Sequence, residues 1–150
     1  MTVDAIVRKG VNSLDSFDFG ATACAVAPPL NKARVAIVTT AGLRADGGGT
    51  WTQGQGFVVL DDAERHFTLA HVSSNFDRTG IASDVNVVYP VDRLHELAER
   101  GVIGSVASKH ISFMGAQTDH NLSTLRLDTG PAAAELLKAD GVDVVLLTPV

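Results

Sequence analysis

Residues 83–115, SDVNVVYPVDRLHELAERGVIGSVASKHISFMG, contain the densest run of structural signals in the chain. Residues 85–89 are mainly β-branched or aromatic, which favours an extended backbone. Pro90 lacks an amide proton and biases its predecessor away from helix. We therefore expect a short strand that ends at Pro90.

A helix is predicted directly after this strand. Asp92 can serve as its N-cap, because a carboxylate accepts from the free N–H groups of a first turn. The helix would cover residues 93–100 and end at Gly101. Residues 102–115 alternate small, polar and apolar side chains, which indicates a loop and a short strand.

The remaining chain alternates strand and helix patterns. Residues 34–40, RVAIVTT, have the β-branched density of a strand buried on both faces. Residues 67–72 and 142–150 are further strand candidates, and residues 131–141 form a helix with Asp128 or Thr129 as its cap. This order predicts a layered α/β sandwich with a mainly parallel, Rossmann-like sheet.

Length and composition fit one α/β domain over residues 1–150. Residues 3–14 form either a short amphipathic helix or a flexible lead-in, within an N-terminal 30 residues that are hard to assign. The chain is 45% hydrophobic and has no bilayer-length apolar run and no secretory signal, so we expect a cytoplasmic protein without membrane contact. A net charge of −5 without basic clusters disfavours nucleic acid.

The glycine-rich residues 41–56 do not predict a nucleotide cofactor. They carry six glycines after a strand, but no helix follows whose N–H groups could hold a phosphate. A substrate-facing loop is favoured, in which Trp51 either covers a pocket or anchors the loop. We expect no cofactor, and Cys24 as a lone cysteine excludes an internal disulfide.

Many polar side chains follow the predicted strand over residues 67–72 and flank the predicted strand that ends at Pro90. Such a group either lines a pocket or caps turns and helices. Its members are His71, Ser73, Asp77, Asp84, Asn86, Asp92 and Arg93.

The five histidines have no spacing typical of a metal site. His71 and His110 are the candidates for convergence from separate strand ends, with Asp77, Asp119 or His120 as a third ligand. A neighbouring carboxylate or backbone group is the favoured partner of these rings, so no metal is expected. His66 and His95 are expected at the surface.

Several stretches together resemble the selenoprotein B family of glycine, sarcosine, betaine and D-proline reductases. They are residues 86–115, the strand pattern ARVAIVTTAGL at 33–43, the region around His71 and Asp77, and DGVDVVLLTPV at 140–150. In that family the segment like LLTPV is followed by a selenocysteine or cysteine that acts as the nucleophile. Here the sequence stops at Val150.

The resemblance implies a domain that takes part in reductive C–N cleavage of a small amino acid or related carboxylate, with thiol-donor proteins as partners. A nucleophile placed after a strand and at a helix start gains from the helix dipole. The residues implied near the substrate are His71, Asp77, Asn86, Asp92, Arg93, His110 and Ser112, with Thr148 near the nucleophile.

Two explanations account for the end at Val150. Either a UGA codon read as selenocysteine ended the reading frame, which the resemblance favours and which leaves the 150 residues inactive, or the domain ends naturally. The alternative functions are a non-catalytic, homodimeric ligand-binding or partner-binding module and a histidine-based metalloenzyme.

Overall fold

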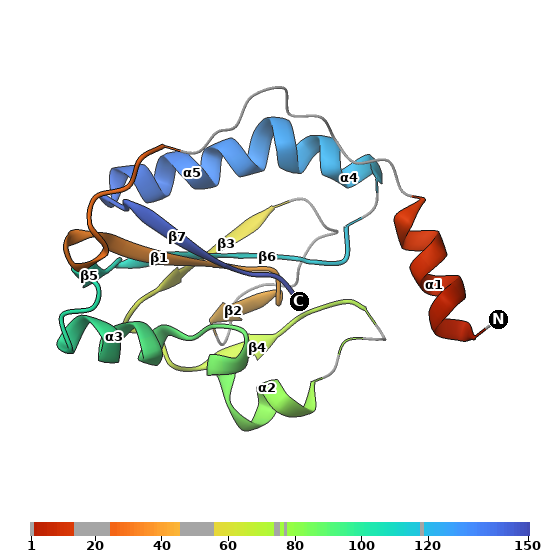
Figure 1. Cartoon of the computed structure of the whole chain (residues 1–150), viewed down its shortest axis with the longest axis horizontal. Helices are drawn as coiled ribbons and strands as arrows, with labels where there is room; N and C mark the ends of the chain where they lie inside the picture. The colour runs from red at the N-terminus through yellow and green to blue at the C-terminus, as the bar shows by residue number, and fades with distance from the viewer. Residues whose placement is uncertain (1, 14–24, 46–55, 74–75, 77, 118) are drawn as a thin grey trace.

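A five-stranded sheet forms the centre of the molecule (Figure 1). β1 (Arg34–Thr39) lies between β7 (Val144–Thr148) on one side and β5 (Ser105–Val106) and β6 (Lys109–Phe113) on the other, all parallel to it. β3 (Phe57–Asp61) pairs antiparallel with β6. The predicted α/β architecture with a mainly parallel sheet is confirmed. The structure is a computed structural model and describes residues 2–13, 25–45, 56–73, 76, 78–117 and 119–150.

β1 is buried on both faces, as its β-branched sequence predicts. Val35 and Ile37 belong to the apolar core on one face, and Ala36 contributes to a second core on the other. The strand changes partners along one edge: Arg34 and Val35 pair with β5, whereas Val38 pairs with β6. β1 therefore connects all the parallel strands.

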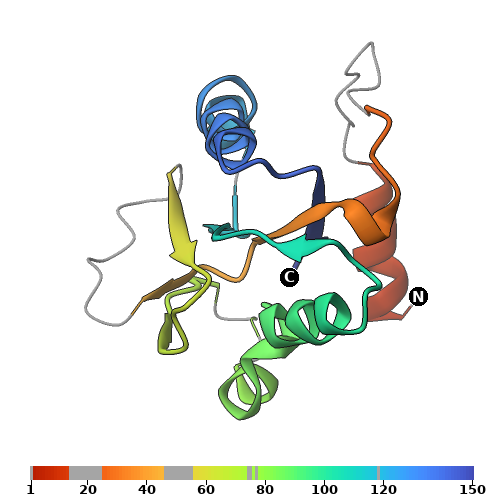
Figure 2. The same ribbon diagram turned by 90° about the vertical axis from the view of Figure 1, so that its left-hand side faces the viewer.

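The first core lies between the sheet and a layer of short helices (Figures 1 and 2). This layer contains α2 (Thr79–Ser83), the 3₁₀ turn η2 (Val85–Val87) and α3 (Val91–Glu99). Tyr89 and Leu94 are buried in it. Gly101 adopts a φ of 69° and ends α3, as predicted.

The second core lies under one long helical segment on the opposite face (Figure 2). This segment consists of α4 (Asp119–Thr124), a π-helix (Leu125–Thr129) and α5 (Gly130–Ala139). Ala133 and Leu137 of α5 are buried in this core together with residues of β1 and β6.

A small antiparallel ribbon extends the first layer. β2 (Leu43–Ala45) pairs with β4 (Phe67–Leu69), and an isolated bridge between Ala41 and Met114 joins its start to the end of β6. Two other helical elements are α1 (Val3–Asn12), which agrees with the helix alternative for the N-terminus, and η1 (Leu30–Lys32). No helix of the described residues is long and apolar enough to span a bilayer.

The strand predicted over residues 85–89 is wrong. Asp84 accepts a hydrogen bond from the Asn86 N–H at 2.9 Å and starts a 3₁₀ turn. Val88 and Tyr89 then enter the core beside the sheet. The β-branched side chains fill the core here without pairing as a strand, and α3 begins at Val91, so Asp92 lies inside its first turn.

Residues 116–130, AQTDHNLSTLRLDTG, have the polar composition of a connection between elements, and this prediction is also wrong. Residues 119–129 are helical, and the helix continues through Pro131 by widening into a π turn. The Gly130 N–H bonds to the Leu125 carbonyl oxygen, and a Cβ at Gly130 would lie only 2.5 Å from that oxygen. A glycine is therefore required at this turn.

Candidate functional site

The carboxyl ends of β1, β6 and β7 meet at one edge of the sheet. Thr39 of β1 lies in register with Ser112 of β6 and with Thr148 of β7. Just beyond, the Val150 N–H donates to the Thr40 Oγ1 at 2.9 Å. Open α/β sheets bind their ligands at such carboxyl ends.

Gly115 allows the chain to pass closely at this edge. A Cβ on Gly115 would lie 2.8 Å from the Val150 carbonyl oxygen and 2.9 Å from the Thr40 carbonyl oxygen. The glycine thus lets the end of β6 approach the end of β7.

Two site candidates on these strands differ in their hydrogen bonding. The Thr148 hydroxyl donates to the Val88 carbonyl oxygen at 2.8 Å and ties β7 to the helical layer. Ser112 is fully buried, and its hydroxyl has no hydrogen-bond partner among the described residues. Buried polar atoms are nearly always paired, so the hydroxyl of Ser112 is available for a ligand or water.

His71 lies beside the same edge. A Cβ on Gly42, which lies just after β1, would be 3.1 Å from the backbone nitrogen of His71 and 3.1 Å from the Met114 methyl carbon. The imidazole stacks on Phe76 with ring centroids 4.0 Å apart, and its Nδ1 accepts from the Ser73 N–H at 3.2 Å. Burial, with a contribution from Arg78, lowers the pKa of His71.

The second ring nitrogen of His71 is buried and has no partner in the described part of the chain. Because Nδ1 accepts a hydrogen bond, Nε2 carries the proton in the neutral ring. His71 therefore supplies a buried donor. We call Thr40, His71, Ser112, Thr148 and Val150 the strand-end group.

His110 has a different environment although it lies only two residues before Ser112. Its Nδ1 accepts from the Ile37 N–H at 2.9 Å, at the point where β1 changes partner from β5 to β6. Its Nε2 lies 3.5 Å from an Asp62 carboxylate oxygen. Burial lowers the pKa of His110 although Asp62 acts in the opposite direction, so the ring is neutral at pH 7.

Sequence reasoning missed Asp62, which joins two histidines. The His95 Nε2 lies 2.8 Å from the same carboxylate oxygen, and His95 is partly exposed on α3. Tyr89 packs edge-on to His110 with ring centroids 5.4 Å apart, and burial raises its pKa. No local pattern predicts these contacts, because Asp62 and His110 are 48 residues apart.

Three candidates near the start of α3 are engaged with other side chains: Asn86 in η2, and Asp92 and Arg93 in the first turn of α3. The Asn86 amide donates to Asp84 at 3.0 Å and to Asp92 at 2.9 Å. Hydrogen bonds from the Asn86 backbone and side chain lower the pKa of Asp84. Asp92 also pairs with Arg65 at 3.4 Å. We call Arg65, Asp84, Asn86 and Asp92 the helix-start group.

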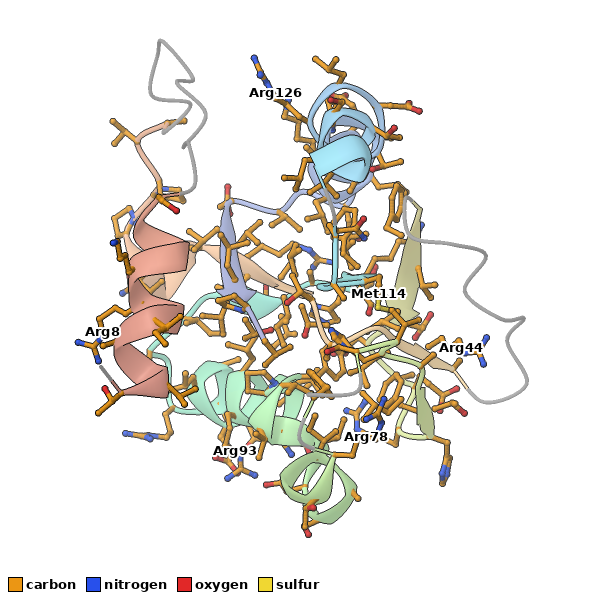
Figure 3. The ribbon with its side chains drawn as sticks, turned by 90° about the vertical axis from the view of Figure 1, so that its right-hand side faces the viewer. Arg8, Arg44, Arg78, Arg93, Met114 and Arg126 are labelled. Carbon is orange, nitrogen blue, oxygen red and sulfur yellow. The ribbon has the colours of Figure 1, made fainter. Side chains whose placement is uncertain are left out.

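Arg93 forms an ion pair with Glu96 at 2.8 Å. The Arg93 side chain is more than half exposed, and the Glu96 side chain is half exposed. Figure 3 shows Arg93 on the outer side of α3, directed away from the sheet. The structure therefore brings Ser112 and Thr148 together at the strand ends with His71 nearby, and it holds Asn86 and Asp92 in a separate group.

Three residues discussed from the sequence, Cys24, Trp51 and Asp77, lie outside the described residues. Within the described parts of the chain, no three His, Cys, Asp or Glu side chains are placed to share a metal ion. His71 and His110 instead have the ring, backbone and carboxylate contacts given above.

Two cavities flank the sheet. The larger, of about 830 Å³, lies on the α5 face and is walled mainly by apolar side chains from β1, β6 and the long helical segment, with Thr40 and Gly115 at its edge. The smaller, of about 440 Å³, is formed by β2, β4, α2 and η2 and contains Arg65 and Arg78. The larger cavity therefore reaches the strand-end group.

Comparison with known proteins defines the class of this chain. Residues 13–150 match the family described as glycine/sarcosine/betaine reductase selenoprotein B (GRDB). The chain belongs to this family, as its sequence motifs suggest.

Two curated relatives are subunits of reductases. The D-proline reductase subunit gamma of Acetoanaerobium sticklandii is 33% identical over 127 residues, which cover 82% of this chain and 51% of the relative. The sarcosine reductase complex component B subunit beta of Peptoclostridium acidaminophilum is 27% identical over 126 residues, which cover 79% of this chain and 28% of the relative. No solved structure gave a significant match.

Proposed function

We propose that this chain forms the substrate-binding part of an amino-acid reductase that cleaves a C–N bond through a selenolate or thiolate. Membership of the selenoprotein B family supports the proposal, as do relatives named as D-proline and sarcosine reductase subunits. The chain spans about half or less of those relatives, so the complete activity requires further protein. A small amino acid is the proposed substrate.

The convergence of three strand ends at Val150 is the observation on which the proposal depends. Val150 is hydrogen-bonded to the Thr40 hydroxyl, and a Cβ on Gly115 would lie 2.8 Å from the Val150 carbonyl oxygen. A nucleophile delivered next to Val150 would lie at the same edge of the sheet as Ser112, whose buried hydroxyl, like the Nε2 of His71, has no partner among the described residues. Strand ends of this kind hold reacting groups in many α/β enzymes.

The proposed roles differ among the candidate residues. The hydroxyl of Ser112 and the Nε2–H of His71 would donate to the substrate, since both are buried without a described partner. Thr148 would hold the end of β7 in place through Val88. The hydrogen bonds of His110, Asn86 and Asp92 would stabilise the strands and the helix start around the site. The family resemblance keeps Asp77 and Arg93 as candidates for contact with the substrate.

The proposed chemistry is a displacement followed by a two-electron reduction. The selenolate or thiolate attacks the substrate carbon that bears nitrogen, a carbon–selenium or carbon–sulfur bond forms, and the amine leaves with the C–N bonding pair and takes up a proton. A thiolate of a partner protein then attacks the selenium or sulfur, and the released carbon is protonated. A second thiol regenerates the nucleophile, so a dithiol supplies both electrons.

Two measurements test the proposal. The codons after Val150 in the gene should encode selenocysteine, as UGA, or cysteine. With a dithiol, the 150 residues alone should release no ammonia or amine from glycine, sarcosine or betaine and should not open the ring of D-proline to a primary amine. A longer chain that carries the nucleophile should cleave the C–N bond together with its partner proteins. C–N cleavage by the 150 residues alone, or a gene without either codon, would contradict the proposal.

A second candidate, a non-catalytic homodimeric binding module, is supported by the exposed apolar side chains of β7. Leu147 is 66% exposed and Leu146 is 39% exposed, although the strand has the sequence of a buried one. Light scattering separates the candidates. Two results together would favour the binding module. The chain would be a dimer in which the backbone amides of β7 are protected from hydrogen exchange, and no longer chain would turn over a substrate.

A further inference from the structure

The smaller cavity combines an apolar floor with two arginines. Leu43 and Leu69 come from the β2–β4 ribbon, Ile81 comes from α2, and Val85 comes from η2. Its volume of about 440 Å³ is within the range of small-molecule sites. A ligand in this space would contact both hydrocarbon side chains and guanidinium groups.

Arg78 is held in place by backbone carbonyl groups. Its Nη2 donates to the carbonyl oxygens of His71 at 2.7 Å and Ser73 at 3.3 Å, and its Nη1 donates to that of Phe76 at 3.2 Å. Carbonyl oxygens fix the guanidinium plane but leave its positive charge uncompensated. No carboxylate in the described part of the chain forms an ion pair with Arg78.

Arg65 supplies a second cation to the same cavity. Its Nη1 donates to the carbonyl oxygens of Asp62 and Glu64, and its Nε lies 3.4 Å from Asp92. Figure 3 shows Arg78 between the helical layer and the β2–β4 ribbon, whereas Arg93 lies outside. Arg65 is thus already paired with a carboxylate, and Arg78 supplies the positive charge of the cavity that has no ion pair among the described residues.

We propose that this cavity binds a monocarboxylate with a compact aliphatic or cyclic body, its carboxylate on Arg78 and its body on the apolar floor. Arginine is the side chain best suited to a carboxylate, because its planar donors match both oxygens. The floor offers a phosphate or a sugar little to bind. The inference goes beyond the proposed function, because binding here needs neither a nucleophile nor the strand-end group.

Calorimetric titration of the full chain with 3-methylbutanoate tests this site. A Kd of about 1 mM or tighter is expected for a ligand of this size. The uncharged 3-methylbutanamide should bind at least about tenfold more weakly, since it lacks the charge that faces Arg78. Acetate, which has no hydrocarbon body, and inorganic phosphate should also bind more weakly.

Variants locate the binding. Arg78→Gln should weaken binding of 3-methylbutanoate by about tenfold to a hundredfold, as expected for loss of a charge-assisted hydrogen bond. Arg93→Gln is the matched control, because it removes the same charge from the outside of α3 and should leave Kd unchanged. Ala82→Phe, at the exposed rim of the cavity, should block binding without removing a core side chain or a charge.

Several results would overturn the inference. One is that the unmodified chain does not bind 3-methylbutanoate at 10 mM. Another is that it binds the amide or phosphate as tightly as 3-methylbutanoate. A third is that Arg78→Gln and Arg93→Gln change the Kd of 3-methylbutanoate equally. Thermal melting shows whether Arg78→Gln has unfolded. In that case Ala82→Phe decides the question, and unchanged binding by that folded variant would also overturn the inference. Loss of reductase turnover plays no part in this test.

Discussion

The strand-end group and the helix-start group contain similar polar side chains but use them differently. Asn86 and Asp92 bond to each other and to Asp84 and Arg65, so the helix-start group satisfies its polar atoms internally. In the strand-end group, the Ser112 hydroxyl and the His71 Nε2 are buried without described partners. Polar atoms left unpaired at strand ends indicate a ligand site more strongly than the number of polar residues does.

His110 lies two residues before Ser112, but both of its ring nitrogens have partners. Its replacement should reduce the free energy of unfolding more than any other substitution considered below. His110→Phe leaves the Ile37 N–H buried without an acceptor and removes the ring nitrogen that faces Asp62. We expect a loss of about 3 kcal/mol in the free energy of unfolding, measured by urea denaturation. His95→Phe, which removes the partly exposed partner of Asp62, should cost less than about 1 kcal/mol. Equal losses would show that the bond to Ile37 has little weight.

Asn86→Ala should also be destabilising, because it breaks the bonds that close the helix-start group. The amide contacts Asp84 and Asp92, and its oxygen accepts from the Asp92 N–H at 3.2 Å. The expected loss is about 2 kcal/mol by urea denaturation. Arg93→Gln, at an exposed ion pair of the same helix, should change stability by less than about 0.5 kcal/mol. A neutral Asn86→Ala would refute the structural role of this group.

Acid should weaken the fold through the buried neutral histidines. Burial lowers the pKa of His110 below its ordinary value of 6.5, so the unfolded chain takes up the proton first as the pH falls. The free energy of unfolding should therefore decrease below pH 6.5, by at most about 1.4 kcal/mol per pH unit from His110, and stop decreasing below its folded pKa. His71 acts in the same direction. A His110→Asn variant should reduce this slope; an unchanged slope would contradict the assignment.

Thr148→Val should give a smaller loss, within the strand-end group itself. The hydroxyl bond to the Val88 carbonyl oxygen joins β7 to the helical layer, and valine keeps the side-chain volume. We expect about 1 kcal/mol from denaturation. Thr148→Ser keeps the hydroxyl and serves as the control. If serine and valine cost the same, the bond does not hold β7.

Ser112→Ala should have the smallest effect on stability and should matter for binding. Because the hydroxyl has no described partner, its removal should change the free energy of unfolding by less than about 0.5 kcal/mol. Binding of sarcosine or D-proline by the same variant should weaken. A loss of more than 1 kcal/mol would reveal a structural partner and remove Ser112 from the proposed site.

The sequence predicts what depends on local patterns. The β-branched run of β1 indicates a strand buried on both faces, and Gly101 marks the end of α3. The same reasoning fails at residues 85–89, because β-branched side chains fill a core equally well from a 3₁₀ turn. It also fails at residues 119–129, a helix of polar sequence that continues into α5 and packs Leu125 against the second core.

The site is less predictable than the fold because its contacts join distant residues. The family motifs select His71 and His110 equally, yet only the structure distinguishes a ring with a free buried nitrogen from one bonded at both nitrogens. Asp62 has no signal in its local sequence, since its partners lie on α3 and β6. The role of Arg78 likewise depends on carbonyl groups brought together by the folded loop.

Nitrogen-15 NMR of the histidine rings, during addition of sarcosine or D-proline to the labelled chain, tests most directly whether the strand-end group is the substrate site. The account predicts that the His71 Nε2 resonance moves with increasing ligand and that the His95 and His110 resonances do not. Movement of the His95 resonance with a fixed His71 resonance would place the ligand elsewhere and contradict the account.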